Sequence, residues 1–432
     1  MDSGRMGVTL TWPNHEKYLL SPRGADGAPV WVEKDHPAAL TVAGSEMTAT
    51  VGDVNPAASH ANNLLFTGDS LDVLKMLTSS ADYSPHFGGR VKLAYLDPPF
   101  NTGQTFTHYS DAMAKGVWLS FMKQRLLLVR DLLTSDGTVW VHLDDASSHL
   151  ARFLLDDIFG PECFVADVSW QRKSSGANAG RSIAPIVDHI LVYSRHPKSF
   201  SANRLPRSAK QSRRYQNPDN DPRGAWTPGD YSQNKTREQS PGCWYPIVRP
   251  SDGQEIWPAP HRVWAWTEEH HLRNIADGRV WWGALGETRK PYYKRFESEL
   301  GGFLPHNWWP YDVVGHNRES KNEIKALFPD VDYFFDTPKP ERLLERILHI
   351  GSNPGDIVLD VFAGSGTTSA VAHKMSRRWV AAEILPETVA TFTLPRLEKV
   401  VAGDDPGGIT KAVNWTGGGG FVTVTVTPPA HS

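Results

Sequence analysis

Hydrophobic positions along the chain form short runs that alternate with segments of helical spacing. Short apolar runs predict strands, and apolar residues three or four positions apart predict helices. In the first half of the chain the pattern predicts helices over residues 117–133 and 149–159, and strands over 63–66, 91–96, 138–143, 164–170 and 186–193. Further on, it predicts helices over 341–350, 367–375 and from about 387, and strands over 357–361 and 379–383.

This alternation predicts an α/β fold with one mostly parallel sheet that helices cover on both faces. Residues 186–193 are expected to pair with the preceding strand, because the connection lacks a helical period. The alternating residues 421–426 predict an edge strand. The expected organisation is an N-terminal arm, a first α/β half, an insertion, a second α/β half and a tail, over 1–60, 61–194, 195–335, 336–400 and 401–432.

The expected insertion differs from its surroundings in composition. Proline and glycine are frequent in it, and the apolar periodicity breaks down. Nine of the sixteen tryptophans nevertheless fall between residues 201 and 330. Because linkers rarely contain tryptophan, the segment is interpreted as a domain with its own small core.

Composition excludes several classes of protein. No apolar run is long enough to cross a bilayer, and no secretory signal is visible, so no membrane association is expected. Cys163 and Cys243 are the only cysteines, which excludes a disulfide framework and a cysteine-based zinc site. No other metal-binding spacing appears, and a cytoplasmic location is expected.

Charge is distributed unevenly along a chain of net charge −3. Residues 171–223 hold eleven lysines and arginines but only three acidic residues. Such a basic segment in a nearly neutral chain is typical of a surface that binds a polyanion. The alternative is an ordinary solvated surface.

A glycine-rich turn follows the predicted strand over 357–361, which contains Asp360. Gly364 and Gly366 allow a sharp turn from strand to helix and a close approach of the backbone to a ligand. Ser369 stands where a dinucleotide-binding turn has its third glycine, and the lysine of a phosphate-binding loop is absent. The turn therefore suits an adenosyl ligand without phosphates, and Glu383 can bind its ribose hydroxyls.

The sharpest signal is the sequence Asp-Pro-Pro-Phe directly after the strand over 91–96. Two prolines stiffen the backbone and remove two donors, which leaves carbonyl oxygens as acceptors. The Asp97 carboxylate and the Pro98 carbonyl can accept both hydrogens of an amine on a nucleobase, which localises its lone pair for attack on a methyl sulfonium. Phe100 can stack on a base that has left the helix.

Together these motifs resemble the amino-directed DNA methyltransferases. The catalytic motif precedes the cofactor motif, as in the β group, and the chain is most similar to modification (Mod) subunits of type III restriction–modification systems. The resemblance implies a Rossmann-like methyltransferase fold that binds S-adenosylmethionine (SAM). It also implies a mixed, mostly parallel seven-stranded sheet, circularly permuted, with an inserted target-recognition domain.

The resemblance assigns residues to three roles. The catalytic residues would be Asp97, Pro98, Pro99 and Phe100, although many relatives have tyrosine in place of Phe100. The SAM site would comprise Asp69, Thr337, Lys339, Asp360, Phe362, Gly364, Gly366, Thr367 and Glu383. The residues expected to bind DNA are Arg172, Lys173, Arg207, Lys210, Arg213 and Arg214.

The expected activity is methylation of adenine N6 at specific sites in double-stranded DNA. The alternatives are methylation of cytosine N4, and a DNA-recognition subunit for a restriction partner with little activity alone. A C5-cytosine enzyme is disfavoured because neither Cys163 nor Cys243 follows a proline. The family likeness implies a homodimer and a helicase–nuclease restriction subunit as partners.

Overall fold

A computed structural model describes most of the chain, in two compact units. The first unit comprises Met1–Asn203 and Pro305–Ser432, and the second comprises Arg204–Leu304, within the range predicted for the insertion. The described residues are 10–21, 29–101, 113–175, 183–207, 212–299, 301–331 and 335–428.

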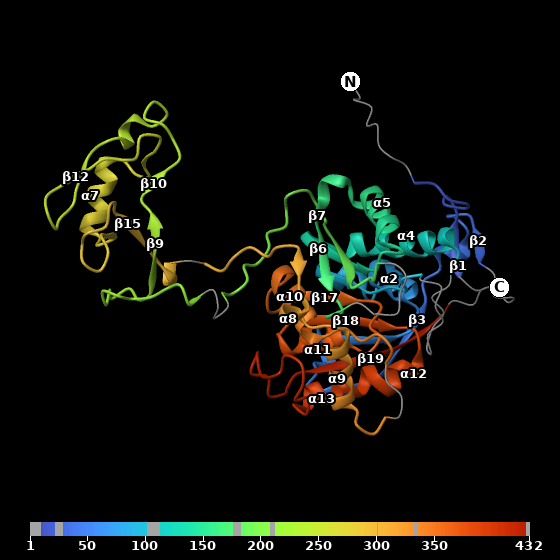
Figure 1. Ribbon diagram of the computed structural model, residues 1–432. Coiled ribbons are helices and arrows are strands. Elements are labelled where there is room, and N and C mark those ends of the chain that lie inside the picture. The colour runs from blue at the N-terminus through green and yellow to red at the C-terminus, as the bar shows by residue number, and fades with distance from the viewer. Residues whose placement is uncertain are drawn as a thin grey trace. The chain divides into compact units, whose positions relative to one another are not determined.

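A ten-stranded sheet forms the centre of the first unit (Figure 1). Its strands follow the order β16, β7, β8, β6, β5, β17, β18, β4, β19, β3. In that order they span Trp308–Trp309, Phe164–Gln171, Val187–Ser194, Leu133–Leu143, Val91–Leu96, Ile357–Asp360, Arg378–Glu383, Asn63–Thr67, Gly420–Thr427 and Gly44–Gly52.

Seven adjacent strands of this sheet, from β7 to β4, are the strands that the apolar runs predict. The five from β6 to β4 run parallel to one another, and β8 is antiparallel to both its neighbours. The mixed, mostly parallel α/β sheet and the pairing of β8 with β7 are therefore confirmed. Three further strands, β16, β19 and β3, extend the sheet beyond the predicted seven.

The strand predicted over 421–426 is present, but the prediction that it lies at an edge of the sheet is wrong. This strand, β19, lies parallel to β4 on one side and pairs antiparallel with β3 on the other. The side chains of β3 are almost all exposed, so backbone hydrogen bonds place it rather than an apolar face. For this reason the sequence pattern does not reveal β3.

The N-terminal segment is more regular than its composition suggests. Besides β3 it contains β1 and β2, which pair antiparallel, the short helix α1 and the 3₁₀ turn η1. Trp12 is buried, and its Nε1 donates to Ser120 Oγ at 2.7 Å. The bounds are Tyr18–Ser21 for β1, Val30–Val32 for β2, Pro37–Leu40 for α1 and Pro56–Ala61 for η1.

Helices cover both faces of the sheet in two groups (Figure 1). On one face α2, α4 and α5 pack side by side, and on the other α10, α11 and α13 do. Their bounds are Ser70–Ser79, Lys115–Leu132, Ser148–Phe159, Glu341–Gly351, Thr367–Lys374 and Leu394–Ala402. Shorter or peripheral helices are α3 (Ser84–Phe87), η2 (Pro161–Cys163), α8 (Tyr311–Val314), α9 (Asn317–Leu327), α12 (Pro386–Thr388) and the π-helix η5 (Val389–Thr393).

The second unit is built around aromatic side chains. Its buried core comprises Tyr231, Tyr245, Ile247, Trp264 and Trp282. A three-stranded sheet, two strand pairs and α7 surround this core. The bounds are Trp226–Asp230 for β9, Ser232–Gln233 for β10, Pro241–Cys243 for η3, Ile247–Val248 for β11, Glu255–Ile256 for β12, Val263–Trp264 for β13, Glu268–Ala276 for α7, Val280–Trp281 for β14, Tyr292–Phe296 for β15 and Glu297–Glu299 for η4.

No helix in the described part of the chain is both long enough and apolar enough to cross a membrane.

Candidate active site

Four acidic residues lie at the carboxyl ends of four neighbouring parallel strands. Asp69 follows β4, Asp97 follows β5, and Asp360 and Glu383 end β17 and β18. These strands are adjacent in the order β5, β17, β18, β4. Ligands of open parallel sheets bind beyond the carboxyl ends of the strands, so the fold brings the predicted catalytic and cofactor residues to one edge.

Asp97 forms an ion pair with Lys339 in a largely buried position. Nζ of Lys339, a residue only 8% exposed, contacts Oδ2 of Asp97. The other carboxylate oxygen, Oδ1, is buried and has no hydrogen-bond partner among the described residues. A buried acceptor without a partner is energetically costly, so this oxygen is suited to a donor on a ligand.

The Asp-Pro-Pro-Phe loop is held through its backbone. Trp118 Nε1, from α4, donates to the Pro99 carbonyl at 2.8 Å. Ser147 Oγ, just before α5, donates to the Phe100 carbonyl at 2.5 Å. Pro98 is buried. Two helices on one face of the sheet thus fix the conformation of the loop.

The Phe100 ring lies against His142, the penultimate residue of β6. The two ring centroids are 5.9 Å apart and the planes meet at 25°, which is a stacked arrangement. Lys339 Nζ lies 5.4 Å from the centroid of the Phe100 ring. Phe100 is half-buried, so part of it is accessible.

The glycine-rich turn after β17 requires glycine at two positions. Gly364 and Gly366 have φ of +50° and +77°, in the left-handed region. A Cβ on Gly364 would lie 2.9 Å from Cζ of Phe335. The Gly364 N–H donates to Oε2 of Glu383 at 2.9 Å, so the carboxylate at the end of β18 also fixes the turn.

Asp360 is buried at the start of this turn. Its Oδ1 accepts a hydrogen bond from the Phe362 N–H at 3.0 Å. Burial raises the pKa of Asp360 to about 7, because a carboxylate loses its hydration there. Phe362 is half-buried beside Phe121, with ring centroids 6.0 Å apart. Thr337 is half-buried two residues before Lys339.

Buried ion pairs support the turn from the side of α11. Arg396 donates to Oγ1 of Thr367, the first residue of α11, at 2.8 Å, and pairs with Glu341 at 2.8 Å. Lys374 pairs with Glu341 at 2.8 Å and with Asp405 at 2.6 Å. Since both cations have buried acidic partners, their charges are compensated within the fold.

Asp69 is engaged with the protein itself. Its Oδ1 caps α2 by accepting from the Leu71 N–H at 2.7 Å. Arg125, which is buried, donates from Nη2 to both carboxylate oxygens at 2.8 and 3.1 Å. A ligand that contacts Asp69 would therefore meet a carboxylate already neutralised by Arg125.

Two of the residues expected to bind DNA lie in the first unit. Arg172, just after β7, forms an ion pair of 2.6 Å with the buried Asp188 of β8. Lys173 is exposed. The neighbours therefore differ, because Arg172 is directed at the interior and Lys173 at solvent.

Other residues expected to bind DNA lie in the second unit. Arg207 and Arg214 lie over the ring of the buried Tyr215, 5.7 and 5.2 Å from its centroid. Arg213 is exposed. Lys210 lies outside the described residues.

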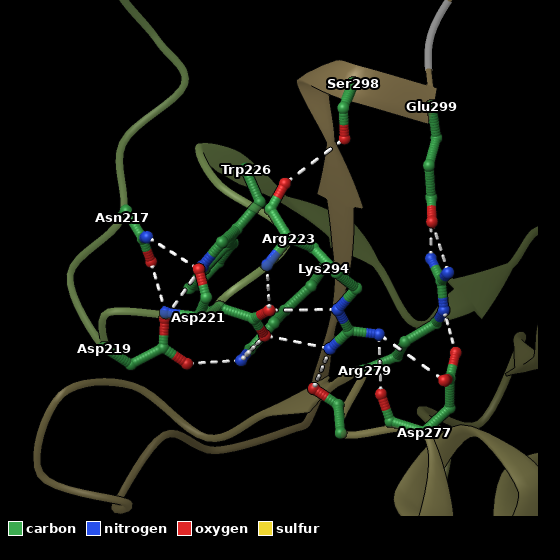
Figure 2. A network of polar contacts seen from close by, with 11 residues as sticks. Asn217, Asp219, Asp221, Arg223, Trp226, Asp277, Arg279, Lys294, Ser298 and Glu299 are labelled. Atoms are coloured by element: carbon green, nitrogen blue, oxygen red, sulfur yellow. Dashed lines mark hydrogen bonds and ion pairs between the residues drawn. The ribbon is translucent and has the colours of Figure 1, made fainter.

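One cation of the basic segment, Arg223, is neutralised by a network inside the second unit (Figure 2). Arg223 pairs with Asp221 at 2.9 Å, and Lys294 pairs with Asp219 and Asp221. The hydrogen bonds from Arg223 hold the pKa of Asp221 well below its usual range. The network extends to Arg279, Asp277 and Glu299, so these charges stabilise the unit.

Several contacts at the site are not evident from the sequence. From the sequence alone, Lys339 is grouped with the cofactor residues. In the structure Lys339 contacts Asp97, which lies 242 positions away along the chain. No sequence signal gives the contacts of Trp118 and His142 with the loop. In the sequence, Arg125 is indistinguishable from the other charged residues of its helix. Only the fold brings it beside Asp69.

Comparison with known proteins identifies relatives over most of the chain. The sequence profile of a family described as "DNA methylase" matches residues 91–393. The "Probable type III restriction-modification enzyme HindVI Mod subunit" of Haemophilus influenzae is 30% identical over 85% of this chain and 54% of its own length. The StyLTI Mod subunit of a type III restriction–modification enzyme, from Salmonella typhimurium, is 32% identical over 75% of this chain and 52% of its own. The chain thus spans about half the length of these relatives.

Among solved structures, the cytosine-N4-specific PvuII DNA methyltransferase is similar with a TM-score of 0.43 and 16% identity. That match covers 78% of this chain and 86% of the other. A complex of M1.HpyAVI with SAM matches with a TM-score of 0.36 and 13% identity, over 77% of this chain and 99% of the other.

Proposed function

Because the chain belongs to the DNA methylase family, we propose that it transfers a methyl group from SAM to the exocyclic N6 amine of adenine in double-stranded DNA. The observation that carries this proposal is the Asp97 carboxylate, whose buried Oδ1 has no donor among the described residues. An amine bears two N–H donors, and Oδ1 together with the Pro98 carbonyl can accept both.

The glycine-rich turn fits SAM as the cofactor. The turn leaves no room for a side chain at Gly364, where a Cβ would lie 2.9 Å from Phe335, and no phosphate-binding lysine is present. When bound, SAM supplies an electrophilic methyl group on a sulfonium. The residues proposed to hold it are Asp69, Thr337, Lys339, Asp360, Phe362, Gly364, Gly366, Thr367 and Glu383.

The chain's own residues would prepare the amine for attack. Phe100 stacks on the extruded base, and Asp97 and Pro98 orient the amine so that its lone pair points away from the ring plane. SAM held beside them would supply the methyl group to the amine nitrogen and would itself become a neutral thioether. The proton that the amine loses passes by way of the Asp97 carboxylate to solvent, while Lys339 stabilises the charge on Asp97.

The basic residues would bind the DNA backbone. Lys173, Arg213 and Arg214 are exposed and can reach phosphates, which fix position but carry no sequence information. Arg207 and Lys210 are proposed to act with them, and the second unit is proposed as the target-recognition domain. From the family resemblance we also propose a homodimer, a helicase–nuclease restriction partner and a cytoplasmic location. The similarity to Mod subunits of type III restriction–modification enzymes supports the restriction partner.

The first test is nucleoside mass spectrometry of plasmid DNA from a methylation-deficient host that expresses the chain. We expect N6-methyladenine with the native chain and none with Asp97→Ala, because the variant loses the acceptor that orients the amine. Asp35→Ala, which removes an exposed carboxylate, is the matched control and should methylate normally. N4-methylcytosine would change the target base but keep the mechanism. Undiminished methylation by Asp97→Ala would refute the role of Asp97.

A further inference from the structure

A chain of polar side chains runs from three neighbouring strands, β5, β6 and β8, to a residue just after β7. Tyr95 on β5 contacts His142 on β6, with 2.8 Å between the hydroxyl and Nδ1. His142 Nε2 lies 3.4 Å from Oδ2 of Asp188 on β8. Arg172, just after β7, pairs with Oδ1 of Asp188 at 2.6 Å. Tyr95, His142 and Asp188 are all at most 3% exposed.

Each ring nitrogen of His142 has a polar partner in this chain. Burial raises the pKa of Tyr95 well above its usual range, so its hydroxyl keeps the proton and can donate to Nδ1 of His142 or accept from it, according to the tautomer. Nε2 faces Asp188, whose charge is balanced by Arg172. Both ring nitrogens are therefore held, which fixes the plane of the imidazole.

Aromatic contacts hold the same ring from two further sides. Trp170 lies edge-on to His142, with centroids 5.3 Å apart and planes at 88°. Phe100 stacks on His142 at 25°. An apolar side chain at position 142 would fill this layer without burying polar groups, so packing alone does not account for the array.

We propose that His142 is a positioning residue that backs the ring of Phe100 and thereby sets the plane on which the target base stacks. This inference rests on the proposed function, because it assigns Phe100 to the base. Tyr95, Asp188 and Arg172 act through His142 by holding its ring. The backbone of the loop is fixed separately by Trp118 and Ser147, so the array governs the ring of Phe100 rather than the path of the chain.

A double-mutant cycle on Phe100 and His142 tests the proposal. The measured quantity is kcat for N6-methyladenine formation on unmethylated plasmid DNA, at saturating SAM and DNA. We expect His142→Leu to lower kcat about tenfold in the native background, within the range for coupled neighbours. In a Phe100→Ala background the same change should alter kcat less than about twofold, since the ring it positions is gone.

A purely structural role for His142 gives a different result. His142→Leu would then lower kcat by the same factor in both backgrounds, and this additivity would overturn the proposal. Binding of S-adenosylhomocysteine and the melting temperature show whether each variant is folded. If His142→Leu does not fold, Tyr95→Phe replaces it in the cycle, because it removes one hydroxyl and keeps the ring.

Arg172 and Lys173 provide a matched pair of variants. If Arg172 acts through Asp188, Arg172→Ala should lower kcat and leave the KM for DNA within about twofold of the native value. Lys173→Ala should raise the KM for DNA, as expected for an exposed phosphate contact. A higher KM with unchanged kcat for Arg172→Ala would overturn its place in the array. A native chain that methylates no DNA would refute the proposed function and this inference together, whereas additive effects in an active enzyme refute the inference alone.

Discussion

Gly364 is the residue where backbone geometry and the proposed cofactor site meet most directly. Gly364→Ala places a Cβ 2.9 Å from Phe335 and at a φ of +50°, so the turn must shift. We expect the affinity for S-adenosylhomocysteine, measured by calorimetry, to fall at least about tenfold, as when about 1.4 kcal/mol of binding free energy is lost.

Gly355→Ala is the control for Gly364→Ala. Gly355 has a φ of +86°, but a Cβ there meets no atom of the described residues within 4 Å. It should cost about 1 kcal/mol of stability through backbone strain and leave ligand affinity unchanged. Equal losses of affinity in the two variants would show that strain, and not the lining of the turn, controls binding.

The placement of single residues at the candidate site was predictable where a short motif follows a predicted strand. Asp97 and Gly364 are such positions, since each belongs to a contiguous motif at a strand end. The partners of these residues were not predictable, because they come from distant segments. Lys339 reaches Asp97, and Arg125 reaches Asp69, only after the sheet has formed.

At the scale of elements, His189 links the strands β7 and β8 and the loop after β6. On β8 it contacts Asp167 of β7 and Asp145 of the loop after β6, both at 3.1 Å. The hydrogen bond with Asp167 is the main cause that raises the pKa of His189 to about 9. A raised pKa means that the folded state binds the proton more tightly, so this stabilisation is complete below about pH 6.5 and is lost as pH rises through about 9.

This linkage predicts a pH-dependent effect of His189→Gln. In urea unfolding, the free energy of unfolding of the variant should be lower than that of the native chain below about pH 6.5, and the difference should shrink above about pH 9. His306→Gln replaces an exposed histidine and should show no such trend. A deficit that stays constant with pH would mean that the charge of His189 contributes nothing.

Elements were predictable to the extent that burial gives them a pattern. The seven strands from β7 to β4 pack against helices on both faces, and their apolar runs identify them. In contrast, β16 has two residues, too few for any period, and β3 is exposed along almost all of its length. The strand β19 was wrongly predicted to lie at an edge for the same reason. The strand that pairs with its outer side, β3, has no apolar pattern that the sequence could reveal.

At the scale of the whole molecule, the two units have separate cores, and the second depends on buried charges. Lys294 is 6% exposed and lies between Asp219 and Asp221 (Figure 2). Lys294→Ala leaves the two carboxylates short of a cation, which should destabilise the second unit by about 3–5 kcal/mol. Calorimetry should show a lower melting temperature for the transition of this unit alone, with binding of S-adenosylhomocysteine by the first unit unchanged.

Lys290→Ala tests whether burial, rather than loss of a positive charge, produces that effect. Lys290 pairs with Asp230 at 2.6 Å in the same unit, but both side chains are more than a third exposed. Solvent and salt screen such a pair, so the variant should lose less than about 1 kcal/mol. Because both variants remove one positive charge, the loss of long-range attraction to DNA should be similar in the two. If Lys294→Ala loses more DNA binding than Lys290→Ala, DNA binding depends on the folded second unit. If the two variants lose the same amount, DNA is recognised outside the second unit.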